Sequence, residues 1–458
     1  MKERFEGVIG KRVLVVGLGK TGFSLSRFLK RLGAEVIATD IKPISDIAGG
    51  EELQCLGVTI EAGGHTVKSF LSSDLIVVSP GVESDMPLLE EAKRKGTEVI
   101  NDIELFSRYV DVPVFAVTGT NGKSTTTTLL AEIFKRAGRK VFMGGNIGIP
   151  AMEYFEGTVR FELCVLEISS FHLELVKTFC PRVAVLLNIT EDHLYRHKSF
   201  KDYADVKFRI FSNQGKDDYA VLNVGDPAIR ERLGRQGLKS NVIPFTTSGR
   251  LKQGLYLRGR EIVSTLGGKE DVYPAEGFYL AGVHNTENIM AVIAAASVAG
   301  IEKETLCDTV KNFRGLPHRM EFVREFSGVR YFNDSKSTNG GSLFKALEGI
   351  GKGKRVILIA GGKDKGGDYG FLREIAGEKV KLLIVIGEAK KRLKDALEGV
   401  AGAMEAEGLK EAVTLAGSMA QPGDVVLFSP ACSSFDMFRN FEERGEAFKK
   451  LVEGLREC

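Results

Sequence analysis

The sequence has no strong excess of charge of either sign. Its 63 lysine and arginine residues are balanced by 60 aspartate and glutamate residues, so the formal net charge is only +3. A charge this small creates no broad field for gathering a polyphosphate backbone. We therefore expect no nucleic acid among its partners.

Cysteine and long apolar runs are also scarce. The six cysteines lie far apart and form no C-x-x-C pair, which excludes a disulfide framework in a chain of 458 residues. No apolar run approaches the ~20 residues of a membrane helix. The first residues, MKERFEGVIG, carry charge where a signal peptide needs an apolar core. We expect a cytoplasmic protein with no membrane partner.

Length and apolar content indicate several globular cores. The 458 residues are about three times the ~150 of a usual domain, and 43% of them are hydrophobic. A predicted alternation of strand, turn and helix begins near Val13. It restarts after Pro113 and again after Leu316. It predicts an α/β protein of three domains, over residues 1–101, 102–315 and 316–458.

The predicted strands are short apolar segments that end in Asp, Gly, Ser or Pro. In doubly wound sheets, ligands gather at such carboxyl ends. The segments are KRVLVVG, AEVIATD, DLIVVSPGV and TEVIND, then VFAVTG, FELCVLEIS, PRVAVLLNIT and DYAVLNVGD, and finally VRYFNDS, RVILIAGG, KLLIVIGE and DVVLFSPA.

Two glycine turns follow predicted strands. Gly17, Gly19 and Gly22 form G-x-G-x-x-G between a strand and a helix, which is typical of a nucleotide site, with Asp40 placed to meet a ribose. The alternative is a tight turn whose glycines serve only packing. This motif by itself is weak.

The second turn, GTNGKST, is a stronger signal. Its backbone is suited to wrap a polyphosphate, Lys123 to offset the charge, and Ser124 to hold Mg²⁺. Val117 stands where the usual first glycine would be, so the loop is shorter than the common pattern. A lysine turn without a ligand is the alternative, but a cation at a helix start is unfavourable unless an anion is present. The cradle consists of Gly119, Thr120, Asn121, Gly122, Lys123, Ser124 and Thr125.

Several motifs together resemble those of the ATP-dependent Mur ligase family. They are GTNGKSTTT, GGNIG, LEISSF, NITEDHL, GVHNTEN, LPHRME, NDSKSTN and SPACSSFDMFRNFEERG, and they extend over all three predicted domains. The resemblance implies a Rossmann-like first domain, a central ATPase-type domain with a phosphate loop and a Rossmann-like third domain. It also implies that ATP activates a carboxylate as an acyl phosphate, which an amine then attacks.

The resemblance implies roles for residues around the phosphate loop. Lys123, His193, Lys207 and Arg319 would be catalytic, and two Mg²⁺ sites would involve Ser124, Glu167, His193 and a Lys207 carbamylated by CO₂. Nucleotide contacts would come from Asn285, Asn288, Arg319, Asp334 and Lys336. Each residue also has an alternative without function. Glu167 could be an ordinary carboxylate at a strand end, His193 a solvated loop histidine and Lys207 a snorkelling lysine. Asn285 and Asn288 could simply cap a helix. His197 follows His193 by four residues, a spacing more often found at a surface than at zinc, and we expect no zinc.

The resemblance also implies two substrates, UDP-N-acetylmuramoyl-L-alanine and D-glutamate, and hence a role in peptidoglycan synthesis. The UDP substrate would contact Gly19, Lys20, Thr21, Asp40, Lys42, Ser79, Pro80, Gly81 and Asn146. D-glutamate would contact Thr338, Lys365, Ser434 and Phe441, although Lys365 by itself reads as a surface lysine. The chain contains no Asn-Pro-Arg, the motif of ligases that add a diamino acid. We expect a monomer with flexible joints near residues 101 and 315.

Other functions remain open at this point. A nicotinamide oxidoreductase would use the first glycine turn but leaves GTNGKST unexplained. A uridine-nucleotide binding module would tolerate loss of Lys123. Other Mur enzymes and folylpolyglutamate synthase share the phosphate loop, and release of phosphate from ATP with a panel of amino acids distinguishes them.

Overall fold

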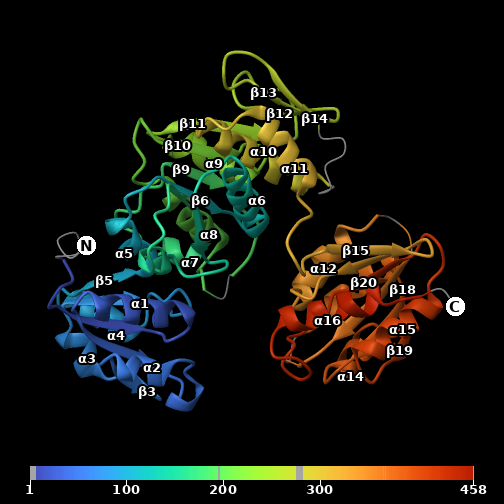
Figure 1. Cartoon of the computed structure of the whole chain (residues 1–458), viewed down its shortest axis with the longest axis horizontal. Helices are drawn as coiled ribbons and strands as arrows, with labels where there is room; N and C mark the ends of the chain where they lie inside the picture. Colours follow the sequence, from blue (N-terminus) through green and yellow to red (C-terminus); the bar gives the residue numbers. More distant parts are fainter. Residues whose placement is uncertain are drawn as a thin grey trace. The chain divides into compact units, whose positions relative to one another are not determined.

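The computed structural model describes residues 7–193, 196–274, 282–351, 353, 355–364, 366 and 368–456. The chain forms two compact units, Met1–Phe313 and Arg314–Cys458. Within the described residues, the first unit contains two β-sheets and the second contains one. Helices and strands alternate in all three, so the predicted α/β fold is confirmed (Figure 1).

The first sheet is parallel, in the order β3-β2-β1-β4-β5. Its central strand RVLVV is apolar on both faces because helices cover both sides. The strands are β1 (Arg12–Val16), β2 (Glu35–Asp40), β3 (Thr59–Ala62), β4 (Leu75–Val78) and β5 (Glu98–Asn101). The helices are α1 (Lys20–Arg31), η2 (Ile44–Asp46), α2 (Gly50–Cys55), α3 (Val67–Ser72), α4 (Pro87–Arg94) and α5 (Asp102–Tyr109).

The second sheet runs β14-β13-β12-β11-β10-β9-β6-β8-β7, and only its β12–β13 and β13–β14 pairs are antiparallel. Its strands are β6 (Val114–Thr118), β7 (Val141–Gly145), β8 (Leu163–Glu167), β9 (Val183–Leu186), β10 (Tyr219–Asn223), β11 (Asn241–Thr246), β12 (Leu255–Arg258), β13 (Glu261–Ser264) and β14 (Asp271–Pro274). Its helices are α6 (Lys123–Arg136), η3 (Ala151–Phe155), α7 (Ser170–Leu173), α8 (Phe200–Phe208), η4 (Arg209–Phe211), α9 (Pro227–Gln236), α10 (Val283–Val298) and α11 (Lys303–Asn312).

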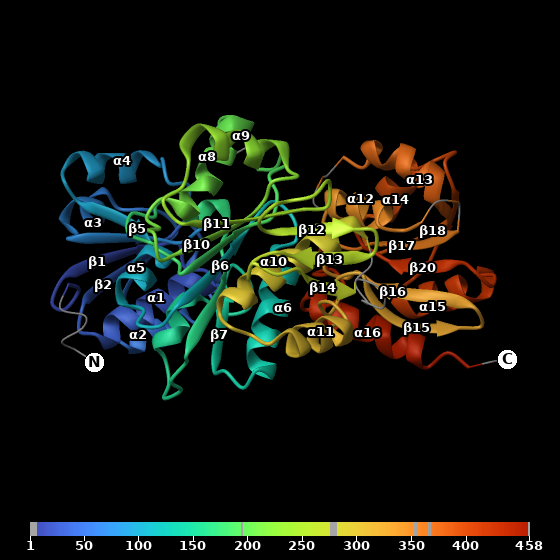
Figure 2. The same ribbon diagram turned by 90° about the horizontal axis from the view of Figure 1, so that it is seen from above.

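Helix α6 begins directly after the phosphate loop, at Lys123, because Gly122 with its positive φ ends the loop there. Helices α10 and α11 pack beside α6 (Figure 2). The alanine-rich stretch of α10 is fully buried, and its small side chains allow this close approach.

The second unit is built on the sheet β15-β16-β20-β17-β18-β19, in which only β15 and β16 are antiparallel. Its strands are β15 (Glu321–Phe326), β16 (Val329–Asn333), β17 (Val356–Gly361), β18 (Val380–Ile386), β19 (Gly402–Glu405) and β20 (Val425–Phe428). Its helices are α12 (Gly340–Glu348), η5 (Gly370–Leu372), α13 (Arg373–Lys379), α14 (Lys390–Ala396), α15 (Leu409–Met419) and α16 (Phe441–Glu453). No helix in the described parts of the chain is long and apolar enough to cross a bilayer.

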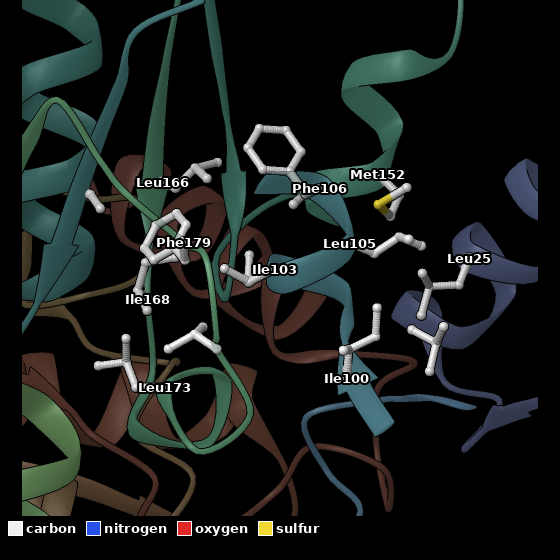
Figure 3. Packing of buried hydrophobic residues seen from close by; sticks show 14 of the residues in the cluster. Leu25, Ile100, Ile103, Leu105, Phe106, Met152, Leu166, Ile168, Leu173 and Phe179 are labelled. Carbon is white, nitrogen blue, oxygen red and sulfur yellow. The ribbon is translucent and has the colours of Figure 1, made fainter. Parts of the chain in front are cut away.

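The two sheets of the first unit share one hydrophobic core. Side chains from α1, α5 and η3 meet there, among them Leu25, Phe106 and Met152 (Figure 3). Hydrogen bonds also hold the segment near residue 101 to the second sheet's domain. The Asn101 side-chain amide donates to the His172 carbonyl, and the Glu104 carboxylate accepts from the backbone amides of residues 177–179. A flexible joint near residue 101 does not fit this packing.

Phe106 offers a test of the shared core. It is fully buried, and its ring lies 5.7 Å from the rings of both Tyr154 and Phe155. We expect Phe106→Ala to lower the free energy of unfolding by about 3–5 kcal/mol, because it leaves a cavity. Urea titration followed by circular dichroism measures this. Phe371→Ala is the control, since that ring is half exposed and its loss should change the midpoint little. Equal effects of the two substitutions would contradict the shared core.

Candidate active site at the phosphate loop

The phosphate loop, residues 119–122, follows the buried strand β6 and leads directly into α6. Gly122 has φ +84°, and a Cβ there would lie 2.2 Å from the Asn288 side-chain oxygen. Only glycine therefore fits where α10 approaches the loop. The loop and the first turn of α6 place backbone N–H groups together at a helix N-terminus, which is an arrangement that binds phosphate.

Residues after the neighbouring strand β9 hold the loop in shape. The Asn188 carbonyl accepts from the Thr120 amide at 3.0 Å, and its side chain exchanges hydrogen bonds with the Asn121 backbone at 2.8 and 3.1 Å. The Thr120 hydroxyl donates to the Thr190 carbonyl at 3.1 Å and lies 3.2 Å from the Tyr203 hydroxyl. The sequence reasoning gave no role to Asn188, Thr190 or Tyr203. The polar run NITED directly after a buried strand was the available signal.

Two lysines converge on one carbonyl group of this loop. Lys123 Nζ donates to the Gly119 and Thr120 carbonyls at 3.0 and 2.8 Å, and Lys207 Nζ donates to Gly119 at 2.8 Å. Lys207 belongs to α8 and is 1% exposed. Burial, and then the charge of Lys123, place the pKa of Lys207 well below its usual value, while Asp192 and Glu167 oppose the shift. Two cations so close together favour an anion at the loop.

Glu167 ends β8, which pairs with β6, and it is 2% exposed. Its Oε1 accepts from the Asn146 amide at 2.7 Å, whereas its Oε2 is buried and has no hydrogen-bond partner within the described residues. A buried carboxylate oxygen in that state costs free energy unless a cation or donor reaches it. The donor chemistry therefore fits Mg²⁺, which prefers oxygen ligands. No group of three or more His, Cys, Asp or Glu side chains in the described chain forms a ready metal site.

His193 lies in the loop after β9 with φ +53°, and its ring packs 4.9 Å from Phe171. Burial lowers the pKa of His193, Asp192 opposes the shift, and Lys123 and Lys207 lower the pKa further. These two lysine charges connect His193 electrostatically to the phosphate loop. His197 is buried, not at the surface, and its Nε2 lies 3.1 Å from the Ser170 hydroxyl.

The asparagines of α10 take different places. Asn288 is 5% exposed and lies against Gly122, with its amide 3.5 Å from the Asn285 side chain. Asn285 is half-buried in the first turn of the same helix. Ser124 and Thr125 occupy the first turn of α6. All of these residues therefore surround the phosphate loop at one end of the sheet.

The first glycine turn lies at a reversal of strand order, where β1 sits between β2 and β4. Gly17 has φ +90°, and its carbonyl accepts from the Ser79 hydroxyl at 2.7 Å. Asp40 accepts from the Leu18 and Lys42 amides at 2.6 and 2.9 Å, so its carboxylate already organises the turn. Gly19, Lys20, Gly81 and the side chain of Lys42 are exposed, and Thr21 and Pro80 are half-buried. Together these residues lie in the turns that follow β1, β2 and β4, at the carboxyl ends where doubly wound sheets bind ligands.

In the second unit, Asp334 and Ser429 lie at the ends of the paired strands β16 and β20. Asp334 accepts from the Ser429 hydroxyl at 2.7 Å and from the Met320 amide at 3.1 Å. Burial raises the pKa of Asp334 to about 7, although both hydrogen bonds and the charge of Arg319 oppose the shift. Its protonation therefore changes near neutral pH.

The remaining predicted residues of this unit lie in its loops. Lys336 Nζ is 5.8 Å from the centre of the Phe441 ring, at the start of α16. Ser434 is 2% exposed, Thr338 is half-buried and Arg319 is exposed. Lys365 lies outside the described residues. The sequence reasoning missed Arg444, which is fully buried, donates to the Ser335 hydroxyl and carbonyl at 3.0 and 2.8 Å, and leaves one guanidinium nitrogen unpartnered within the described chain.

Three family models match successive parts of the chain. They describe the Mur ligase MurD-like N-terminal domain over residues 11–101, the Mur ligase middle domain over 117–296 and the Mur ligase glutamate ligase domain over 318–432. The chain also resembles solved structures in fold. MurC, a UDP-N-acetylmuramate-alanine ligase from Thermotoga maritima, is 19% identical with a TM-score of 0.55, covering 97% of this chain and 99% of that one. MurF from the same organism, in complex with ADP, is 19% identical with a TM-score of 0.56, covering 98% and 96%.

Curated relatives match at much higher identity. The UDP-N-acetylmuramoylalanine--D-glutamate ligase of Geobacter metallireducens is 49% identical over 449 residues, which are 98% of each chain. The ligase of the same name from Pelotomaculum thermopropionicum is 45% identical, covering 97% of this chain and 98% of its own. Since relatives this similar match along nearly the whole length and the family models cover all three sheets, this chain belongs to the Mur ligase family.

Proposed function

We propose that this chain is an ADP-forming ligase that adds D-glutamate to UDP-N-acetylmuramoyl-L-alanine in peptidoglycan biosynthesis. The observation that carries this proposal is the 45–49% identity, over nearly the full length, to relatives bearing that name. Mur ligases use ATP and Mg²⁺ to add amino acids to UDP-N-acetylmuramoyl peptides. The phosphate loop with its two converging lysines agrees with this chemistry.

The reaction must bring two anions together, the substrate carboxylate and the γ-phosphate of ATP. Transfer of the phosphoryl group gives an acyl phosphate and ADP, and the amine of D-glutamate then displaces phosphate and loses a proton. Lys123 would offset charge at the phosphates, and Arg319 would do the same. The further nucleotide contacts proposed are Gly119, Thr120, Asn121, Gly122, Ser124, Thr125, Asn285, Asn288, Asp334 and Lys336.

Two Mg²⁺ sites are part of the proposal. Ser124, Glu167, His193 and a modified Lys207 would hold the ions, which would supply further positive charge to the phosphates. The unpartnered oxygen of Glu167 supports such a site. His193, with its lowered pKa, is a neutral ligand at neutral pH.

We also propose that Lys207 carries a carbamate. A neutral amine attacks the carbon of CO₂, one C–O π pair moves to oxygen, and the nitrogen releases a proton, so a cation becomes an anion. The position of Lys207 supports this: it is buried beside Lys123, and its lowered pKa leaves the amine uncharged more often. The new carboxylate would meet the demand of the site for an anion, and it would offer oxygen to Mg²⁺.

The substrate contacts are proposed from the same resemblance. The UDP substrate would lie against Gly19, Lys20, Thr21, Asp40, Lys42, Ser79, Pro80, Gly81 and Asn146. D-glutamate would be bound by Thr338, Lys365, Ser434 and Phe441. We further propose a cytoplasmic monomer that makes no contact with membrane or nucleic acid and unites three domains, over residues 1–101, 102–315 and 316–458.

The substrate assignment predicts a selective assay. With ATP, Mg²⁺ and UDP-N-acetylmuramoyl-L-alanine, phosphate release should depend on D-glutamate and be at least tenfold slower with L-glutamate, L-alanine or L-lysine. Only D-glutamate would place its amine and both carboxylates correctly. Release that is fastest with a diamino acid would assign the chain to a different Mur ligase activity. NAD(P)H oxidation in place of phosphate release would point to the oxidoreductase alternative.

Lys123→Ala should lower kcat by ~10³-fold or more, because the substitution removes the cation that touches the phosphate loop. A coupled assay for ADP measures this. Lys135→Ala is the matched control, since Lys135 lies in the last turn of the same helix, and it should keep full activity. Activity of Lys123→Ala within threefold of the parent would exclude the proposed role of the loop.

Lys207→Ala should be nearly inactive and should recover activity on addition of acetate or formate, which replace the lost carboxylate. With ¹³CO₂, the parent protein should give a carbamate carbon signal by NMR that Lys207→Ala lacks. Acidification should remove the signal, because a protonated amine cannot hold CO₂. Lys201→Ala, an exposed lysine of the same helix, serves as control and should keep both signal and activity. An active Lys207→Ala protein that is unaffected by acetate would refute the carbamate.

A further inference from the structure

Arg196 connects two loops that belong to different sheets of the first unit. Its NH2 donates to the Val82 carbonyl at 2.7 Å, in the loop that follows β4. Its backbone amide donates to the His193 carbonyl at 2.9 Å, in the loop that follows β9. Arg196 thus links two loops: its side chain bonds the proposed UDP-substrate loop, residues 79–82, and its backbone amide bonds the His193 loop.

The guanidinium group of Arg196 is fixed on several sides. Its Nε and NH2 pair with the two carboxylate oxygens of Glu174 at 3.0 and 2.6 Å. The Arg196 and Glu174 side chains are 8% and 10% exposed, so water screens this pair little. The guanidinium also lies 4.6 Å from the centre of the Phe171 ring, which in turn packs against His193.

Glu174 is itself held in place by a hydrogen bond. It directly follows α7, whose first two residues end the LEISSF segment, and its carbonyl accepts from Arg209 at 2.7 Å. A planar, bidentate arginine fixes direction as well as distance, which a lysine would not do. The network therefore sets the Val82 loop at a defined distance from His193.

Each of the two loops also has bonds of its own. Ser79 is tied to Gly17, and the phosphate loop is tied to Asn188. Loss of Arg196 would therefore leave both ligand sites formed, but the separation between the two loops would no longer be fixed. A reaction between a bound carboxylate and a bound γ-phosphate is sensitive to such a change, since a displacement of about 1 Å costs ~10²-fold in rate.

We propose that Arg196 is a positioning residue that holds the UDP-substrate loop in register with the phosphate loop, so that the substrate carboxylate meets the γ-phosphate. This role rests on the proposed ligase function. Arg196 touches neither reacting group, and it acts through the Val82 carbonyl on one side and through Phe171 and His193 on the other.

The test separates positioning from binding. In Arg196→Met, kcat for ligation should fall by ~10²-fold, while the Kd values for UDP-N-acetylmuramoyl-L-alanine and for a non-hydrolysable ATP analogue, each measured alone by calorimetry, change less than threefold. Glu174→Gln should lower kcat in the same direction. The double variant should lose no more than Arg196→Met, because the two residues act as one unit.

Arg232→Met is the matched control. The Arg232 side chain, on α9, is 5% exposed, and its printed bonds go to α8: it pairs with Asp205 at 2.8 Å and donates to the Lys201 carbonyl at 2.9 Å. Its loss should lower the melting temperature about as much as loss of Arg196 while kcat stays within threefold. Unchanged kcat in Arg196→Met, or equal losses of kcat in both variants, would overturn the proposal. If the parent protein itself shows no ligation, the proposed function fails instead.

Discussion

Two ammonium groups, those of Lys123 and Lys207, donate hydrogen bonds to the same carbonyl oxygen, that of Gly119. Burial, and then repulsion by Lys123, lowers the pKa of Lys207, and the two amines together favour negative charge at the loop. The surroundings of the phosphate loop can be understood from this preference. A bound polyphosphate would offset the charge of Lys123, and the proposed carbamate on Lys207 would reverse the charge there.

The rest of the first unit keeps this arrangement in place. Strand β6 lies between β8 and β9, so the loop after β6 receives Glu167 from one side and Asn188 from the other. The Arg196–Glu174 pair then joins the loops of the two sheets, and the core around Phe106 joins the sheets themselves. Rigid packing and a bidentate ion pair thus fix the loop after β4 relative to the loop after β9.

Burial affects the titratable groups of the two units in opposite directions. In the first unit, it lowers the pKa values of Lys207 and His193, which favours the uncharged form of each. In the second, it raises the pKa of Asp334 to about 7, so that carboxyl group also loses charge. The shared cause is removal of water, which penalises whichever form is charged.

Local patterns in the sequence were sufficient to predict many of the strands and the position of the phosphate loop in the chain. Apolar runs that end in turn residues predicted β1, β6 and β8, because parallel strands covered on both faces are largely apolar. Glycine before lysine at a helix start predicted the phosphate cradle. Strand order, the core shared by α1, α5 and η3, the burial of His197 and the bridge from Arg196 to Val82 depended on the tertiary structure. They join residues far apart in the chain, and no local periodicity records which partner a side chain will meet.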